Sequence, residues 1–285
     1  MGSALKVIKD ELKKGRKDYM KEWSHGNAKH FESQGYYAWM SSFLPEKGTV
    51  LEVGTGDGRA TLQLLKDGHT VISVDENIEC LNSAENRLKS KGYIVARIKR
   101  ETLSVSDADE GTYRIKYKKI SNVPAKFDVL LVEGDFLKDT HLLQWLQSLP
   151  KFAAVVCWLI GTHYARGQNE LIDYLKLPNP SDYRIHVQNE VYEIADLILK
   201  PGGILHLVDR GRIINNEELA LLRSSHEDQA SITSLIVGDI HQREYSEPKI
   251  GGTPMVAQTV DNELEHLTNS NRLLARLFSI VSVKP

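Results

Sequence analysis

The sequence holds few cysteines and almost no excess of charge. Its 285 residues include 2 cysteines, Cys80 in a stretch with helical character and Cys157 in an apolar run. That number does not support a disulfide framework, so we expect a reducing, cytoplasmic location. The formal net charge is −2, with 36 basic against 38 acidic side chains. This balance disfavours a nucleic-acid partner, because nucleic-acid-binding domains usually carry a basic excess or stripe.

Long apolar runs and metal-ligand spacings are missing as well. No stretch of about 18 consecutive apolar residues occurs, so we expect no transmembrane helix and no membrane partner. The N-terminus has no apolar core of the kind found in signal peptides. The 10 histidines are scattered without the spacing of a metal site, and no metal is predicted. A hydrophobic content of 41% over this length is typical of one large globular domain.

One segment is rich in glycine and directly follows an apolar run. Residues 50–60 read VLEVGTGDGRA, with Gly54, Gly56 and Gly58 at alternate positions and Glu52 inside the apolar run. Glycine allows a positive φ and has no Cβ, so the chain can approach a ligand closely here. Leucines at 62, 64 and 65 then favour a short helix whose N-terminus points at the same ligand. The segment predicts a strand, a ligand-binding turn and a helix.

The next apolar run, residues 70–74, ends in two acids. Asp75 and Glu76 stand about twenty residues after the first glycine, where an α/β fold places a carboxylate for ribose hydroxyls. A nicotinamide or flavin site would need glycine or alanine at the sixth position of the glycine motif, and Arg59 stands there. Because a bulky side chain at that position would obstruct helix packing and pyrophosphate approach, the dinucleotide interpretation is disfavoured.

The acid and the Gly-x-Gly-x-Gly spacing resemble the first motif of the class I S-adenosylmethionine-dependent methyltransferases. The resemblance implies that S-adenosyl-L-methionine is the cofactor and that its methyl group is transferred by direct SN2 displacement. It also implies that Glu52 orients the loop, that Asp75 binds the ribose, and that Asp135 and Phe136 bind the adenine. The cofactor-binding residues implied in this way are Glu52, Gly54, Thr55, Gly56, Gly58, Asp75, Glu76, Gly134, Asp135, Phe136, Cys157 and Trp158.

Later segments resemble the same family and complete the expected fold. The apolar run 152–160 suits a central parallel strand, although Ala153 stands where the family usually has an aspartate. The sequence KPGG at 200–203 precedes another apolar run, and runs at 235–237 and 278–283 are expected to form the last two strands. The resemblance covers about residues 45–285. It implies an α/β, Rossmann-like fold with a seven-stranded, mostly parallel sheet, helices on both faces and one antiparallel strand near the C-terminus.

Two segments outside this minimal fold precede the third predicted strand. Residues 1–44 are expected to form a helical arm or cap, basic at its start and then aromatic, in which Trp23 or Tyr37 closes over the methionine end or simply packs. An insertion at about 93–126 predicts a β-hairpin, in which the alternating residues 112–118 pair with 94–99. Its basic face could bind nucleic acid, but lysines commonly protect exposed strand edges, and we favour that interpretation.

A third insertion, at about 161–184, leaves the end of the fourth strand, where the transferred methyl group should lie. Residues 159–162 read LIGT in place of the Asn-Pro-Pro-Tyr of DNA amino-methyltransferases, which disfavours methylation of a base. His163 is the candidate general base, because neutral imidazole can accept a proton from an oxygen or nitrogen nucleophile, and a backbone-capping role is the alternative. Tyr37, Tyr164 and Arg166 are the candidate substrate-binding residues.

These features predict an S-adenosylmethionine-dependent methyltransferase that acts on an oxygen or nitrogen nucleophile, with a small molecule as the preferred acceptor. An RNA or protein methyltransferase that uses the basic insertion at 93–126 is one alternative. A non-catalytic methyltransferase-like binding or regulatory module is another, since an intact cofactor loop does not prove turnover. An aminopropyl transferase would share the fold and the loop, but no acid pair marks the end of the fourth strand.

Overall fold

The chain has an α/β fold built on one large sheet. The structure is a computed structural model and describes residues 2–44, 47–107, 111–137, 139–170, 180–212, 215–249, 251–252, 256–258, 264–266 and 275–285. The strands of the large sheet are β1 (Thr49–Val53), β2 (Thr70–Asp75), β3 (Val95–Ile98), β6 (Val129–Glu133), β7 (Phe152–Trp158), β8 (Leu199–Arg212), β9 (Ile236–Glu244) and β12 (Ala275–Val283). Two smaller hairpins are β4 (Glu101–Asp107) with β5 (Thr112–Tyr117), and β10 (Val256–Gln258) with β11 (Leu264–His266).

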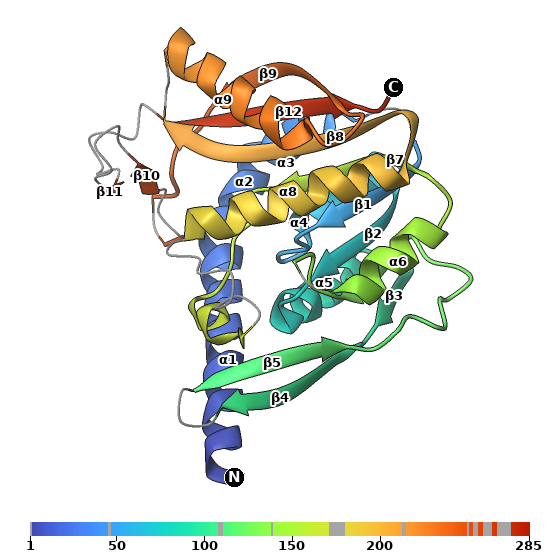
Figure 1. Ribbon diagram of the computed structural model, residues 1–285, viewed down its shortest axis with the longest axis vertical. Helices are drawn as coiled ribbons and strands as arrows, with labels where there is room; N and C mark the ends of the chain where they lie inside the picture. The colour runs from blue at the N-terminus through green and yellow to red at the C-terminus, as the bar shows by residue number, and fades with distance from the viewer. Residues whose placement is uncertain are drawn as a thin grey trace.

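The large sheet has eight strands in the order β3-β6-β2-β1-β7-β8-β12-β9 (Figure 1). β12 runs antiparallel to both of its neighbours, β8 and β9, while the other pairs are parallel. The predicted mostly parallel sheet with one antiparallel strand near the C-terminus is therefore confirmed. The predicted count of seven is wrong, because β3 adds an eighth strand at the edge beside β6.

Helices cover both faces of the large sheet. They are α4 (Arg59–Lys66), α5 (Ile78–Ser90), α6 (Thr140–Ser148), α8 (Pro180–Ile198) and α9 (Asn216–Ala230). Alternate strand residues point to opposite faces, so Leu51 packs under α6 and α8 while its neighbour Val50 packs under α4 and α5. Figure 1 shows α8 and α6 in front of the sheet with α4 and α5 behind it. The strands are covered on both sides, which explains their almost unbroken apolar sequences.

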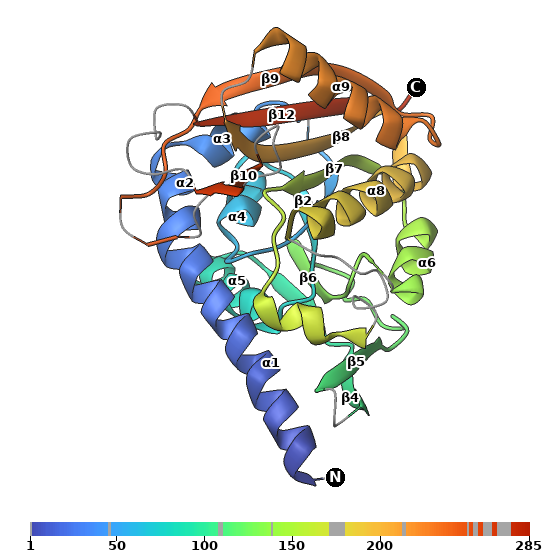
Figure 2. The same ribbon diagram turned by 60° about the vertical axis from the view of Figure 1, so that its left-hand side comes forward.

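The N-terminal segment is helical from Gly2 to Ser41, apart from a turn at residues 34–35. It contains α1 (Gly2–Glu22), a π-helical turn (Trp23–Ala28), α2 (Lys29–Ser33) and α3 (Tyr36–Ser41). Figure 2 shows α1 running along the molecule past the carboxyl end of the sheet, with the N-terminus at its far end. The single π-helical turn occurs where the chain passes from the long helix α1 to the short helices α2 and α3. No helix in the described part of the chain is long and apolar enough to cross a membrane.

The β4–β5 hairpin lies beside α1 and differs from the predicted hairpin (Figure 1). Residues 112–117 pair with Glu101–Asp107, whereas 95–98 pair in parallel with β6, so the predicted pairing of 112–118 with 94–99 is wrong. Alternation in sequence shows which residues share a face, and it does not identify the partner strand. The apolar face, with Tyr113 and Ile115, is buried against Ile8 and Leu12 of α1.

Backbone donors tie this hairpin to the edge of the large sheet. The carboxylate of Glu133, at the end of β6, accepts hydrogen bonds from the backbone N–H groups of Arg100 at 2.8 Å and Glu101 at 3.1 Å. The Arg100 guanidinium in turn donates to Asp139, the N-cap residue of α6, at 2.6 Å.

The predicted insertion at 161–184 is described in part. Residues 164–168 form a short 3-10 helix (Tyr164–Gln168), and residues 171–179 lie outside the described residues.

Candidate functional site

A pocket opens at the carboxyl ends of β1, β2, β6 and β7. It encloses about 620 Å³ of empty space, part of which is open to solvent. Ligands of open α/β sheets bind at this edge, where neighbouring connections leave the strands on opposite faces. The walls come from both the sheet and the N-terminal helices, and the described lining residues are Tyr19, Trp23, Val53, Gly54, Gly56, Val74, Asp75, Glu76, Asn77, Gly134, Asp135, Phe136, Trp158, Leu159, Ile160, Gly161, Thr162, Tyr183 and Val187.

The glycine-rich turn after β1 forms the floor of this pocket. Gly54, Gly56 and Gly58 all have positive φ, at 88°, 53° and 81°, as the sequence pattern predicts. Gly54 and Gly56 line the pocket, whereas Gly58 faces α5, where a Cβ would lie 2.8 Å from the Cα of Ala84. Gly58 is therefore needed for helix packing, and the structure places it away from the pocket lining.

Glu52 lies beneath the turn and stabilises it from inside. Its Oε2 accepts hydrogen bonds from the hydroxyls of Thr61 and Ser73, both at 2.6 Å, and the Ser73 hydroxyl also contacts that of Thr55 at 2.7 Å. Burial raises the pKa of Glu52 to about 7, although the two hydroxyl hydrogen bonds oppose that shift. Neither Glu52 nor Thr55 is part of the pocket lining, so their contribution to the site is to fix the loop.

Asp75 closes the opposite side of the glycine turn. One carboxylate oxygen accepts from the backbone N–H of Gly56 at 3.1 Å, and the other accepts from the N–H of Asn77 at 2.7 Å. Burial, together with the nearby charge of Glu76, raises the pKa of Asp75 to about 7. Asp75 also lines the pocket and forms no ion pair within the described part of the chain, so its carboxyl group is available to a ligand hydroxyl.

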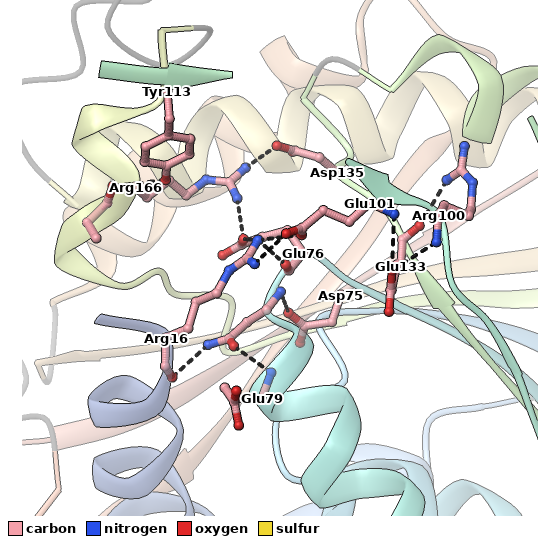
Figure 3. Close-up of polar contacts among 12 residues, drawn as sticks. Arg16, Asp75, Glu76, Glu79, Arg100, Glu101, Tyr113, Glu133, Asp135 and Arg166 are labelled. Atoms are coloured by element: carbon pink, nitrogen blue, oxygen red, sulfur yellow. Dashed lines mark hydrogen bonds and ion pairs between the residues drawn. The ribbon is translucent and has the colours of Figure 1, made fainter. Parts of the chain in front are cut away.

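Glu76 is the centre of a buried charge network (Figure 3). Its carboxylate lies 3.1 Å from Nη2 of Arg16, 3.2 Å from Nη1 of Arg166 and 3.0 Å from Nε2 of His163. Burial alone would raise the pKa of Glu76, but its contacts with His163, Arg166 and Arg16 hold it well below its usual range. Arg16 also forms two hydrogen bonds with the carboxylate of Glu101, at 2.8 and 2.9 Å, so the network joins α1, β2 and the hairpin.

Asp135 and Phe136 lie where β6 ends, as the sequence predicts. Both line the pocket, and Asp135 accepts from the N–H of Leu137 at 2.9 Å and from Nη2 of Arg166 at 2.6 Å (Figure 3). Arg166 thus bridges Asp135 and Glu76, and its guanidinium stacks 4.9 Å over the ring of Tyr183. Predicted as a substrate-binding residue, Arg166 is buried behind the pocket and holds two of its acids in place.

Four further predicted residues lie outside the pocket lining. Tyr37 is buried in an aromatic cluster, 5.7 Å from the ring of Phe31, and Cys157 is buried in the core beneath α8. Tyr164 is 64% exposed on the surface. His163 is buried with its Nε2 toward Glu76, and it stands one residue beyond the pocket-lining Thr162. Cys80 and Cys157 are both free thiols, in a helix and a buried strand as predicted.

The N-terminal helices supply two wall residues that sequence patterns did not identify as a pair. Tyr19 of α1 reaches Gly161, where a Cβ would lie 2.6 Å from the tyrosine hydroxyl oxygen. Trp23 lies over the glycine turn, where a Cβ on Gly56 would be 2.9 Å from its Nε1. Trp23 was one of two candidates to close the methionine end, whereas Tyr19 carried no signal. The one signal that could have identified Tyr19 is its spacing of four residues from Trp23, because residues four apart lie on the same face of a helix.

Two other features bear on what the pocket can hold. Arg59, the side chain that disfavoured a dinucleotide, points out of the pocket to Glu32 of α2 at 2.7 Å and also contacts Asp57. Within the described ranges, no group of three or more histidine, cysteine, aspartate or glutamate side chains is arranged to hold a metal ion.

Comparisons with known proteins give similarity of structure alone. No protein-family model matches the sequence, and no curated protein matches it either. Among solved structures, one chain from a complex of a Haloferax volcanii methyltransferase activator with a proposed methyltransferase is 16% identical, with a TM-score of 0.45 over 94% of this chain and 97% of that one.

Two further solved structures are similar at the same level. A precorrin-6y C5,15-methyltransferase from Geobacter metallireducens is 14% identical, with a TM-score of 0.43 over 88% of each chain. A precorrin 8W decarboxylase from Methanobacterium thermoautotrophicum is 14% identical, with a TM-score of 0.43 over 88% of this chain and 90% of that one. Identities and superpositions this low assign no activity to this chain.

Proposed function

We propose that this protein is an S-adenosylmethionine-dependent methyltransferase whose acceptor is an oxygen or nitrogen nucleophile of a small molecule. The observation that carries the proposal is the convergence of Gly56, Asp75 and Asp135 on one pocket. They come from the ends of three adjacent strands, β1, β2 and β6, and they supply an open backbone turn and two carboxylates. That combination suits the phosphate-free nucleoside of S-adenosylmethionine better than a dinucleotide, whose pyrophosphate two neighbouring carboxylates would repel.

The residues present fit the cofactor in their order across the sheet. Asp135 and Phe136 would hold the adenine, Asp75 the ribose hydroxyls, and the turn at Gly54 and Gly56 the remainder through backbone groups. Because β1 lies between β2 and β7, the end of the cofactor away from the adenine faces β7. Bound S-adenosylmethionine supplies a methyl group that its sulfonium charge already activates. The chain then has to bind, orient and exclude water, and Trp23 and Tyr19 cover the pocket for this purpose.

The lining at the β7 end favours a small, uncharged acceptor. It consists of apolar and aromatic side chains together with Gly161 and Thr162, and no lysine or arginine occurs among the described lining residues. A nucleic acid would require cations for its phosphates, and the two nearby arginines, Arg16 and Arg166, are already paired with acids. The hydroxyl of Thr162 is buried without a hydrogen-bond partner in the described structure, so it is available to an acceptor group.

His163 remains our proposed general base, with one condition. Its Nε2 faces Glu76, so the proton of the acceptor would have to reach Nδ1, which has no hydrogen-bond partner among the described residues. His163→Gln should lower methyl transfer at least tenfold while the affinity for S-adenosylhomocysteine changes by less than threefold. Undiminished transfer would leave His163 as a structural partner of Glu76.

Thermal unfolding with four ligands tests the proposed function. S-adenosylmethionine and S-adenosylhomocysteine at about 100 times their Kd should stabilise the fold by about 2.7 kcal/mol, which raises the Tm of a chain of this size by roughly 5 °C. Decarboxylated S-adenosylmethionine and NAD are the comparison ligands. The absence of a shift with the first two, or a larger one with NAD, would contradict the proposal.

A transfer assay separates an enzyme from a binding module. Labelled methyl from S-adenosylmethionine is followed into the small-molecule, RNA and protein fractions of a cell lysate. Label in the small-molecule fraction is the expected result. Label in RNA or protein would refute the proposed acceptor class, and cofactor binding without any transfer would indicate a non-catalytic module.

A further inference from the structure

Three buried polar side chains form a chain of hydrogen bonds through the large sheet. Trp158 at the end of β7 donates from Nε1 to Nδ1 of His206 on β8 at 3.0 Å. Nε2 of His206 lies 2.7 Å from the hydroxyl of Ser279 on β12. His206 and Ser279 are 0% exposed and Trp158 is 7% exposed, so the chain is closed to solvent at one end and reaches the pocket at the other.

The chemistry of the three groups fixes the direction of both hydrogen bonds. An indole Nε1 can only donate, so Nδ1 of His206 must be the unprotonated nitrogen of a neutral imidazole. Nε2 therefore carries the proton and donates it to Ser279. Burial, with a smaller contribution from His241, lowers the pKa of His206 to about 3, so the imidazole stays neutral at physiological pH. The indole of Trp158 thus has a permanent acceptor.

Aromatic packing holds the imidazole as well. The ring of His206 meets the indole of Trp158 nearly edge to face, with 5.7 Å between centroids and 78° between planes. The ring of Phe43, which follows α3, packs on His206 at 5.4 Å. His206 is therefore enclosed by two rings and hydrogen-bonded at both nitrogens, which leaves it a single orientation.

The backbone changes direction directly after Trp158. Leu159 has a φ of 59°, the only positive φ found at a non-glycine residue in the described part of the chain. Its N–H still donates to the carbonyl of Val208 at 2.8 Å, so the turn begins within the sheet rather than beyond it. A leucine with a left-handed backbone is strained, and such strain persists only where contacts with the surrounding structure hold the residue in that conformation. The turn places Trp158, Leu159 and Ile160 in succession on the pocket wall.

We propose that His206 and Ser279 are positioning residues, which hold the indole of Trp158 as a fixed wall of the methyl-acceptor end of the pocket. This inference rests on the proposed function, because the β7 end is the acceptor end only if the adenosine lies over β2 and β6. Without His206, the indole N–H would be buried without a partner, and the ring would turn to satisfy it. The wall that aligns the acceptor would then move, while the adenosine contacts at Asp75 and Asp135 would not.

Two substitutions of His206 form a matched pair. In His206→Asn the side-chain oxygen replaces Nδ1 as an acceptor for Trp158, whereas in His206→Gln the amide replaces the more distant Nε2 beside Ser279. Both variants are neutral and polar, so they differ mainly in whether Trp158 retains its partner. Ser279→Ala is a milder third variant, because it removes only the partner of Nε2 and keeps the imidazole ring. It serves as the test if both His206 variants unfold.

Nuclear magnetic resonance and methyl transfer provide the readouts. The indole N–H signal of Trp158 is assigned by its loss in Trp158→Phe, and S-adenosylhomocysteine is the probe. We expect this signal to move on addition of the probe in the parent and in His206→Asn. In His206→Gln the chemical shift of this signal should already differ from that of the parent before the probe is added. Transfer to the small-molecule fraction should fall at least tenfold in His206→Gln and less than threefold in His206→Asn, with the Kd for the probe unchanged within twofold in both.

Several outcomes would overturn the positioning role. The first is a Trp158 indole signal that does not respond to S-adenosylhomocysteine in the parent. The second is equal methyl transfer in the His206→Asn and His206→Gln variants. The third is a Kd for S-adenosylhomocysteine that weakens in a His206 variant together with its methyl transfer. If the two His206 variants unfold, Ser279→Ala decides, and an unchanged Trp158 signal with unchanged transfer refutes the role. A parent protein that does not bind S-adenosylhomocysteine contradicts the proposed function instead, so the two failures are distinguishable.

Discussion

Gly56 and Gly92 both have a left-handed backbone, at φ values of 53° and 86°, but their surroundings differ. A Cβ on Gly56 would lie 2.9 Å from Nε1 of Trp23, whereas a Cβ on Gly92 meets nothing within 4 Å. Alanine at either position should cost about 1–2 kcal/mol of folding free energy, because an L side chain is strained there. Of these two positions, only Gly56 has a neighbouring side chain that an added methyl group would displace.

The matched substitutions Gly56→Ala and Gly92→Ala separate backbone strain from ligand contact. We expect both variants to lose free energy of unfolding, measured with urea, and the loss should be larger in Gly56→Ala, where the new methyl group also displaces Trp23. The affinity for S-adenosylhomocysteine, measured by calorimetry, should fall at least tenfold in Gly56→Ala alone, because the new methyl group displaces Trp23 and occupies the turn. Equal affinities in the two variants would show that the turn does not contact the ligand.

The carboxyl group of Glu52 gives a second prediction at the residue scale, on the pH dependence of folding. Its pKa is about 7 in the folded protein and near 4.3 in an unfolded chain. A group whose pKa is raised on folding contributes its stability fully below the unfolded pKa, and this contribution is lost as the pH rises through the folded value. The folded state therefore loses stability from this group between about pH 4.5 and pH 7.

Glu52→Gln removes this titration and keeps a side chain of the same shape. The free energy of unfolding of the variant minus that of the parent should increase as the pH is raised from 5 to 8, because the parent loses stability as Glu52 ionises whereas glutamine stays neutral. The oxygen of the amide can still accept from Thr61 and Ser73, and among the described residues Oε1 of Glu52 has no hydrogen-bond partner that the amide N–H₂ would lose. Urea unfolding at four pH values measures the difference, and a constant difference would refute the raised pKa.

Among the elements, α1 depends on one buried cation. Arg16 is 1% exposed and pairs with both Glu76 and Glu101, and the backbone carbonyl of Arg16 accepts from Asn77 at 3.0 Å. Removing one partner of a buried ion pair leaves an uncompensated charge, which typically costs about 3–5 kcal/mol. Because α1 carries Tyr19 and leads directly into Trp23, its attachment decides whether the pocket has an upper wall.

Arg16→Leu should therefore release α1 before the sheet unfolds. Amide hydrogen exchange is expected to accelerate in α1, with little change in β1 and β2, whose hydrogen bonds lie in the core. Lys17→Leu is the control, because Lys17 is the neighbouring, exposed cation on the same helix. If α1 stays equally protected in both variants, the helix is held by its apolar contacts with the hairpin and not by Arg16.

The elements differ in how far the sequence predicts them, for physical reasons. Strands β1, β2, β6 and β7 were predictable because burial on both faces gives unbroken apolar runs with clear ends. A strand at 94–99 was predicted as well, but its place at the edge of the large sheet beside β6 was not, since its residues are only half-buried and do not form an unbroken apolar run. Pairing partners depend on the tertiary fold, and a sequence pattern contains no information on that choice.

In the candidate site, too, the residues at strand ends were predictable from the sequence and their tertiary partners were not. Asp75, Glu76 and Asp135 were predictable as neighbours because parallel strands end at one edge of a sheet. Their cations, Arg16 and Arg166, were not predicted as partners, because they come from segments 60 and 31 residues away that pack only in the folded chain. Glu76 and Arg166 were therefore assigned to ligands, whereas most of their bonding capacity serves the fold.

On the scale of the whole molecule, the distribution of charge distinguishes two classes of acceptor. Lys116 on β5 and Lys118 directly after it are exposed, while Arg114 is paired with Glu170 at 2.8 Å. The aromatic side of the same strand packs against α1, with Tyr113 1% exposed, so the ring of Tyr113 is not presented for a base to stack on. A net charge of −2 adds no general attraction for a polyanion.

The double variant Lys116→Glu with Lys118→Glu tests this conclusion, with Lys66→Glu and Lys91→Glu as a control pair of equal charge change on other exposed positions. We expect the parent to bind single-stranded RNA more weakly than about 10 μM at 0.15 M salt, in the range of non-specific binding. Methyl transfer to small molecules should be the same within twofold in both pairs, because neither pair lines the pocket. Tight RNA binding that is lost only in the hairpin pair would instead make β5 a recognition surface. Transfer would then have to be measured with RNA as the acceptor.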